Sequence, residues 1–179
     1  MPLLTSSVNG FWKKVRTPSG EALCLSTLKQ ARNPHFFAAW DVPDTIEGRF
    51  DCAVLHMCLL LRHLKGPMAQ SAFDSFFSYT TLTLREMGVS DLKVGKQVKT
   101  CAKFFYGALK AYNNALDGKT SLEEALTRNL YGNSSSVWAH EVGKYVRRCD
   151  QFLGSQNLQE KGAESIAWPK VRLRTINNF

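Results

Sequence analysis

The chain has 179 residues, 23 of them basic and 15 acidic, which gives a formal net charge of +8 at pH 7. Hydrophobic residues make up 44% of the sequence, which excludes wholesale disorder, and the length suits one domain with a sizeable core. The basic excess favours an acidic partner, such as anionic lipid, RNA or a negatively charged protein surface.

The five cysteines are widely spaced and contain no CxxC motif, which argues against a disulfide framework and favours a reducing compartment. We predict that each is a small buried hydrophobic residue. The N-terminal segment lacks an apolar stretch followed by a cleavage site, so no secretory signal is expected. The longest apolar run, Cys52 to Leu61, is too short to span a bilayer, which needs about 20 residues. A cytoplasmic protein is therefore predicted, with attachment to a membrane surface left open.

The first third of the chain predicts a flexible start and two helices. Residues 1–19 are small, polar and basic, and we expect them to be loosely ordered. A helix is predicted from about Glu21 to Arg32, where Asn33-Pro34 ends it. The next helix is predicted to start near Asp44, because this acid and another three residues later have the spacing of a capping box, and to run to Leu64. Apolar residues surround most of this second long helix, so we expect it to be central and buried.

Gly66-Pro67 ends that helix and starts a third one, from about Met68 to Met87, with Gly88 as its C-terminal cap. Aromatic side chains recur along this helix at short steps. They are interpreted as core residues or, alternatively, as the lining of an apolar groove that could cover client segments. These residues are Phe73, Phe76, Phe77 and Tyr79.

The fourth helix shows the clearest pattern in the chain. It is predicted to start at Ser90 or Asp91 and to end at Asp117-Gly118. Apolar residues recur along it at alternating steps of four and three, which predicts one face in the core. This apolar face consists of Val94, Val98, Cys101, Phe105, Ala108, Tyr112 and Ala115. At 100° per residue, Lys96, Lys99, Lys103 and Lys110 fall on the opposite side, with Tyr106 beside this row and Gly107 as a gap in it.

Two further helices are predicted before the C-terminus. Thr120 and Glu123 have capping-box spacing at the start of a helix that runs to about Tyr131. After a GNSSS loop, a last helix is expected from Val137 to Leu153. Its predicted buried side consists of Trp138, Val142, Tyr145, Val146, Cys149 and Phe152.

The sequence after this helix is basic and alternates polar with apolar residues, which favours a tail or at most an edge strand. The predicted fold class is all-α: a single compact bundle of about six helices with flexible basic termini. The predicted organisation is a flexible N-terminal segment over residues 1–19, a helical domain over residues 20–155 and a basic tail over residues 156–179.

Two stretches look like phosphate-binding loops but fail the GxxxxGK[ST] pattern. The DGKT stretch has Asn113 where a glycine belongs, and a predicted helix precedes it instead of a strand. In the second stretch, six residues separate Gly88 from Gly95, and Gln97 replaces the required Ser or Thr. Nucleotide hydrolysis is therefore not expected.

No catalytic or metal site is predicted either. His56 and His63 share a helix face with Cys52 one turn earlier, but a zinc site needs three or four converging ligands, so we interpret these histidines as structural. The HEVGK stretch lacks the second histidine of HExxH, and the acids form no general acid/base pair. The protein is therefore predicted not to be an enzyme and to bind no cofactor and no metal.

The lysine side of the fourth predicted helix remains the candidate site. No acid occurs from Leu92 to Leu116, so the lysines lack the Glu–Lys pairs that usually support a solvated helix face. Two interpretations stay open: an ordinary solvated face, or a docking surface for an acidic partner.

Three blocks resemble, in order and spacing, the ubiquinol-cytochrome c chaperone family. They are RFDCAVLH (Arg49–His56), LREMGVSDLKVGKQVK (Leu84–Lys99) and FFYGALKAYNNAL (Phe104–Leu116). The resemblance implies a helical assembly factor for the cytochrome bc1 complex that binds newly made cytochrome b. It further implies a bacterial-type member at the cytoplasmic face of the inner membrane, possible contact with the ribosome and a small partner subunit.

Joined to the lysine row, the resemblance predicts the residues that contact the client or partner. These are Arg85, Glu86, Asp91, Lys96, Lys99, Lys103, Phe105 and Tyr106. Two alternative functions remain: a ribosome- or RNA-binding helical adaptor, and a peripheral protein whose basic tails touch an anionic membrane surface.

Overall fold

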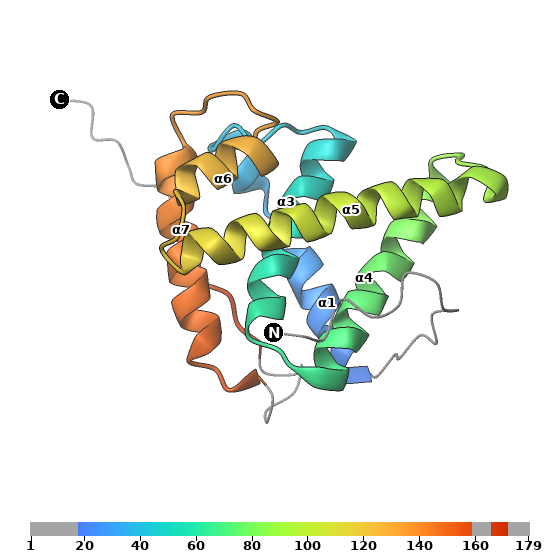
Figure 1. Ribbon diagram of the computed structural model, residues 1–179, viewed down its shortest axis with the longest axis horizontal. Helices are drawn as coiled ribbons and strands as arrows, with labels where there is room; N and C mark the ends of the chain where they lie inside the picture. Colours follow the sequence, from blue (N-terminus) through green and yellow to red (C-terminus); the bar gives the residue numbers. More distant parts are fainter. Residues whose placement is uncertain (1–17, 159–165, 172–179) are drawn as a thin grey trace.

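Every regular element in the described part of the chain is an α-helix (Figure 1). The computed structural model describes residues 18–158 and 166–171. The helices in these ranges are α1 (Pro18–Ala31), α2 (Pro34–Ala38), α3 (Ile46–Arg62), α4 (Gly66–Glu86), α5 (Asp91–Leu116), α6 (Leu122–Asn129) and α7 (Ala139–Gly154). Apart from the five-residue α2, all have eight residues or more, so the all-α prediction is confirmed. No described helix is long and apolar enough to cross a membrane.

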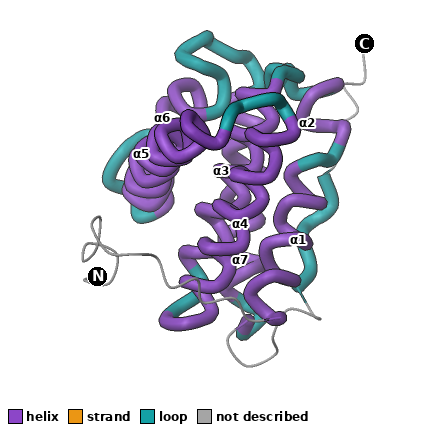
Figure 2. Tube along the Cα trace, turned by 90° about the vertical axis from the view of Figure 1, so that its right-hand side faces the viewer, coloured by secondary structure: helices purple, strands orange, loops and turns teal. Residues whose placement is uncertain are grey.

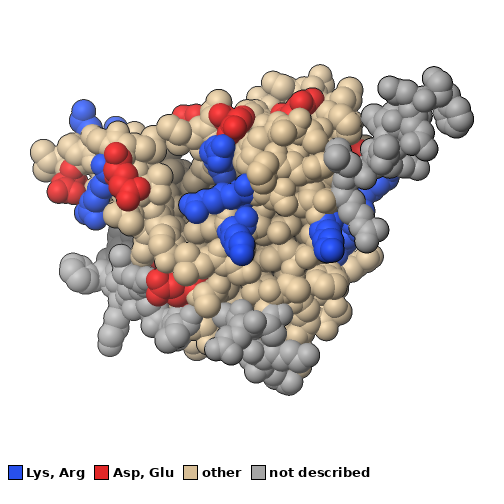
Figure 3. Space-filling model, turned by 180° about the vertical axis from the view of Figure 1, so that it is seen from behind, with Lys and Arg blue, Asp and Glu red and all other residues tan. Residues whose placement is uncertain are grey.

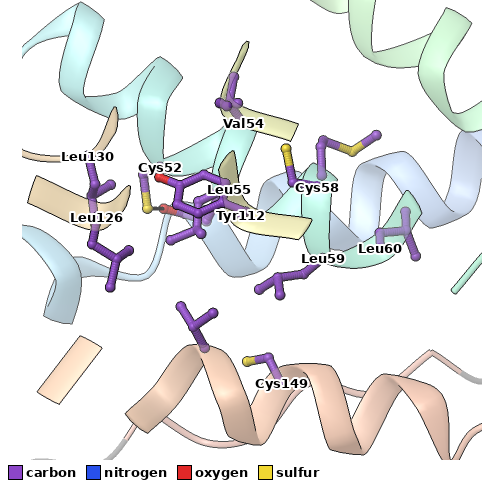
Figure 4. Packing of buried hydrophobic residues seen from close by; sticks show 14 of the residues in the cluster. Cys52, Val54, Leu55, Cys58, Leu59, Leu60, Tyr112, Leu126, Leu130 and Cys149 are labelled. Atoms are coloured by element: carbon purple, nitrogen blue, oxygen red, sulfur yellow. Dashed lines mark hydrogen bonds between the residues drawn. The ribbon is translucent and has the colours of Figure 1, made fainter. Parts of the chain in front are cut away.

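Helix α3 lies in the middle of the bundle, as its apolar circumference predicts. Figure 2 shows it between α1 on one side and α5 and α6 on the other. In Figure 4, Tyr112 of α5 lies among Cys52, Leu55 and Cys58 of α3. These four side chains are at most 2% exposed, so α5 is fixed against the centre of the fold by a fully buried aromatic residue.

The cysteines behave as buried apolar residues with one exception. Four of the five are buried, whereas Cys101 on α5 is partly exposed, and all five are free thiols. Burial raises the pKa of the Cys52 and Cys58 thiols far above the usual range, and that of Cys149 to about 12. These three side chains therefore stay protonated and unreactive at neutral pH.

Glycine determines where α4 stops. Gly88 has a φ of 86°, a left-handed conformation that glycine adopts without strain. Its N–H donates to the Arg85 carbonyl at 2.9 Å, and the Val89 N–H donates to the Leu84 carbonyl at 3.0 Å. These bonds satisfy carbonyl groups at the helix end, and they confirm the predicted cap and the sharp turn into α5.

Both predicted capping boxes are displaced by one residue. Helix α3 is capped by Thr45, whose hydroxyl accepts from the Gly48 N–H at 3.1 Å, whereas Asp44 pairs with Arg49. Helix α6 is capped by Ser121, whose hydroxyl accepts from the Glu124 N–H at 3.2 Å. The predictions of Asp44 and Thr120 as caps were therefore wrong, because in each case the next residue also has a short oxygen-bearing side chain and takes the cap position.

Replacing the observed α3 cap should destabilise the fold more than replacing the predicted one. Thr45→Ala leaves the Gly48 N–H without its acceptor, and we expect the free energy of unfolding to fall by about 1 kcal/mol. Asp44→Ala removes only an exposed ion pair, which contributes about 0–1 kcal/mol. Urea denaturation of both variants measures the difference. A larger loss for Asp44→Ala would contradict the assignment.

The end of α7 and the segment that follows it differ from the prediction. Phe152 is 42% exposed, and Leu153, at 1%, fills the core instead. The described segment 166–171 has no regular structure but lies against the bundle. The Trp168 ring lies 5.5 Å from the His56 ring, and the Gln156 amide exchanges two hydrogen bonds with the backbone of Ala167. This part of the predicted tail is therefore attached to the core.

Candidate docking surface

Helix α5 places its lysines on the side away from the core, as predicted. It crosses the front of the bundle in Figure 1. Val94, Phe105, Ala108, Tyr112 and Ala115 are buried on its inner side. The exposed lysines of the outer side, here called the lysine row, are Lys96, Lys99, Lys103 and Lys110.

The four side chains of the lysine row form no ion pair with any described residue. Some basic side chains on other helices do have acidic partners: Arg62 pairs with Asp117 at 2.6 Å, and Arg147 with Glu123 at 3.5 Å. In Figure 3, the face opposite that of Figure 1 carries basic groups with acidic groups close to several of them. Like charges along the row repel one another, a cost that an acidic partner would remove.

The corner between α4 and α5 brings three of the predicted partner-binding residues to the surface. Arg85 and Asp91 are exposed and pair with each other at 3.0 Å, and Glu86 is exposed beside them. An exposed pair contributes little to stability, so both side chains can exchange this contact for one with a partner.

Phe105 does not lie on the surface with the other predicted residues. Its ring is 0% exposed and lies 5.4 Å from the ring of Phe73 and 5.6 Å from that of Phe76. Phe105 therefore packs α5 against α4 and is not accessible to a partner. Phe73 and Phe76 are themselves buried, so these two of the four aromatic residues belong to the core, whereas Phe77 and Tyr79 are only partly buried.

Tyr106 is the aromatic residue that a partner can reach. It is half-buried, and its ring lies 5.7 Å from that of Phe73. Burial, with a smaller contribution from the Asp74 carboxylate, raises the pKa of its phenol, so the hydroxyl stays neutral and can donate a hydrogen bond. The position beside the lysine row agrees with the prediction from helix geometry.

Sequence reasoning missed an apolar residue at the start of the same surface. Leu92 is 98% exposed, and Met87, on the same corner, is 47% exposed. Leu92 precedes Lys96 by four residues and therefore lies on the same side of α5. The helical spacing that identified the row was thus sufficient to find Leu92, which adds an apolar contact to a basic surface.

A hollow between α5 and α6 interrupts the row at the predicted gap. Its volume is about 300 Å³. From α5 it is lined by Gly107, Lys110, Ala111 and Asn114, and from the α6 side by Thr120, Ser121, Glu124, Ala125 and Arg128. The position of α6 relative to α5 depends on the tertiary fold, so sequence periodicity predicted the gap but not the hollow.

The histidines singled out in the sequence take part in separate structural contacts. His56 is fully buried, with Nδ1 2.8 Å from the Cys52 carbonyl and Nε2 3.0 Å from the Tyr145 hydroxyl. His63 Nε2 lies 2.7 Å from a carboxylate oxygen of Asp150. Within residues 18–158 and 166–171, no three His, Cys, Asp or Glu side chains are arranged to hold a metal ion.

Comparison with known proteins agrees with the resemblance found in the sequence. The family model described as ubiquinol-cytochrome C chaperone matches residues 38–168, which is more than half of the chain. The chain belongs to the ubiquinol-cytochrome c chaperone family. Membership gives it a role as an assembly chaperone of the cytochrome bc1 system, and the matched range contains the whole lysine row and the hollow.

A solved structure supports the assignment of this family member. The crystal structure of the Cbp3 homolog from Brucella abortus is 32% identical in sequence and superposes with a TM-score of 0.77. The match covers 88% of this chain and 92% of that one. The search among curated proteins gave no match.

Proposed function

We propose that the protein is a non-catalytic chaperone that binds newly synthesised cytochrome b through the lysine row and the α4–α5 corner. The observation that carries this proposal is the row of exposed lysines without an ion pair to any described residue, on a member of a family of bc1 assembly chaperones. Holding a client requires no catalytic group, but it does require a surface that contacts apolar and polar parts of the client together.

The surface supplies both kinds of contact. Leu92 and Tyr106 offer apolar area at two points along α5, and the lysines orient charged parts of the client. Such charges speed up association and fix its register more than they add affinity. The proposed location is the cytoplasmic face of the inner membrane, where a client such as cytochrome b is inserted.

Charge reversal tests this surface. The triple variant Lys96→Glu, Lys99→Glu, Lys103→Glu should keep the thermal unfolding temperature close to that of the wild type, because these side chains are exposed and have no ion pair with a described residue. Co-purification of cytochrome b should fall roughly tenfold or more, since like charges would now face each other.

A matched control reverses three exposed basic residues elsewhere: Lys29, Arg32 and Lys170. This control should retain cytochrome b, although its net charge changes by the same amount. Unchanged capture in the lysine-row variant, or equal loss in both variants, would rule out the proposed surface.

An anionic membrane is the second candidate for this surface, and the exposure of Leu92 beside the row favours it. Ribosomal RNA is a third possible partner of the lysines, and its binding would fall steeply as salt is raised. Flotation with anionic vesicles and sedimentation with ribosomes at several salt concentrations separate these two functions from client binding.

A further inference from the structure

Gly107 occupies a position where the fold has no need of glycine. It lies in the interior of α5, where glycine is less favourable than alanine by about 1 kcal/mol. Its φ is not positive, and a Cβ built on it would meet no atom of a described residue within 4 Å. By contrast, a Cβ at Gly48 would lie 2.0 Å from the Pro43 carbonyl oxygen, so there the fold itself requires glycine. At Gly107 the missing side chain leaves open space outside the chain.

That open space is the hollow between α5 and α6. Gly107, Ala111 and Ala125 contribute only small side chains to it, so a partner can approach the backbone of α5 closely. The volume of about 300 Å³ lies at the lower end of the range for small-molecule sites. The hollow therefore suits a single side chain of a partner rather than a cofactor.

Basic side chains dominate the charged rim of the hollow. Lys110 and Arg128 line it, Lys103 precedes it by one turn on α5, and Glu124 is the single acid among the described lining residues. None of these three basic residues forms an ion pair with a described residue. Lys103 and Lys110 are seven residues apart, which corresponds to about 10 Å along the helix.

We propose that this hollow is a docking notch for a helical protein segment that carries acidic side chains, with one side chain of that segment seated over Gly107. Acids seven residues apart on the partner helix would meet Lys103 and Lys110, one on each side of the seated side chain. The docking notch rests on the proposed function, in which a protein partner is held, and it adds the chemistry of the segment that is recognised.

The shape of the hollow favours a protein partner over lipid or RNA. A bilayer surface lies flat against the lysine row and has no single group to fill the space between α5 and α6. Single-stranded RNA is held by stacking on aromatic rings, and none of the described residues that line the hollow is aromatic. A side chain presented by a helix fits both the volume and the charge of the hollow.

The first test fills the notch with a side chain at position 107. The side chains introduced by Gly107→Ala and Gly107→Leu would extend into open space, so we expect both variants to fold. The thermal unfolding temperature of Gly107→Ala should be roughly 2–4 °C above that of the wild type. Capture of cytochrome b by the full chain should fall roughly tenfold for the alanine variant and further for leucine.

Gly95 provides the matched control. It also lies in the interior of α5, and its Cβ would meet no described atom within 4 Å, but it does not line the hollow. Gly95→Ala and Gly95→Leu should show the same change in stability and no loss of capture. If Gly107→Leu captures cytochrome b as well as Gly95→Leu does, the notch is excluded as a site for cytochrome b, even though the client assignment stands.

The second test identifies the partner directly. A photo-crosslinking residue at position 111 inside the notch should form adducts with a protein segment that has acids at helical spacing, and Lys103→Glu with Lys110→Glu should abolish them. Adducts with such a segment of another protein would support the notch and overturn cytochrome b as its occupant. Adducts only with phospholipid or ribosomal RNA, adducts with a segment without acids, or no adduct would each overturn the notch.

Discussion

Phe105→Ala should remove about 3–5 kcal/mol from the free energy of unfolding, a large share of the stability of a domain of this size. The ring is fully buried, and its centroid lies between 5.4 and 5.6 Å from those of Phe73, Phe76 and Phe77. Truncation to alanine leaves a cavity at the point where α5 meets α4, and the surrounding rings can fill it only in part. Urea denaturation followed by circular dichroism measures the loss.

Tyr106→Ala is the matched control, since the two residues are neighbours on the same helix. Tyr106 is half-buried, so its removal should cost only about 1–2 kcal/mol and should act on partner binding instead. Phe105→Leu should recover most of the stability that Phe105→Ala loses, because it refills the cavity. An alanine variant that unfolds like the wild type but loses cytochrome b would show that Phe105 belongs to the docking surface after all.

The contrast between these neighbours shows what helical periodicity can predict. The angular positions on α5 placed Phe105 in the core and the lysines outside, and the structure confirms both. The prediction that Phe105 contacts a partner conflicted with that geometry. A side chain on the buried stripe of an amphipathic helix packs in the core and is not accessible to a partner.

Helix ends were predicted well where glycine or proline determines them, and less well where a side chain does. Gly88 and Gly66-Pro67 act through backbone conformation, which the residue type specifies directly. A cap depends on whether one hydroxyl or carboxylate reaches a particular N–H. When two adjacent residues could both act as the cap, the exact position of the first helical turn decides which one reaches the N–H. At the start of α3 this is Thr45 and not Asp44.

Contacts between distant segments could not be predicted from one sequence. The attachment of Trp168 to His56 joins residues more than a hundred positions apart, and nothing in the local pattern indicates it. The hollow between α5 and α6 likewise depends on the angle of the turn from Asp117 to Ser121. The sequence predicted only that Gly107 leaves a gap, and the tertiary fold decides that α6 encloses that gap on one side.

The buried contacts of His56 predict how the fold responds to acid. Nδ1 lies 2.8 Å from the Cys52 carbonyl and must donate to it, so Nε2 is the acceptor for the Tyr145 hydroxyl at 3.0 Å. This arrangement needs a neutral ring. Burial lowers the pKa of His56 from 6.5 to about 4, although the bond to Cys52 acts in the opposite direction.

Because this pKa is lower in the folded state, the unfolded chain binds a proton first as the pH falls. The contribution of His56 to stability is complete above pH 6.5 and is lost between pH 6.5 and about 4, by up to about 3 kcal/mol.

Asp51 has the opposite effect on the pH dependence of stability. Burial and the Glu47 carboxylate raise the pKa of Asp51 from 3.8 to about 7, so its contribution to stability is lost as the pH rises through the same window.

We therefore expect Asp51→Asn to reveal a pH dependence that is partly cancelled in the wild type. In this variant the free energy of unfolding should fall by about 3 kcal/mol from pH 7 to pH 4, more steeply than in the wild type. Adding His56→Gln should remove most of that fall. The NMR signals of the His56 ring should titrate with a midpoint of about 4 in the folded protein. Asp117 and Asp150 have lowered pKa values, so their contributions to stability change mainly below about pH 4 and do not obscure the effect of His56. A midpoint near 6.5, or a pH dependence of stability that survives His56→Gln, would show that the acid response arises elsewhere.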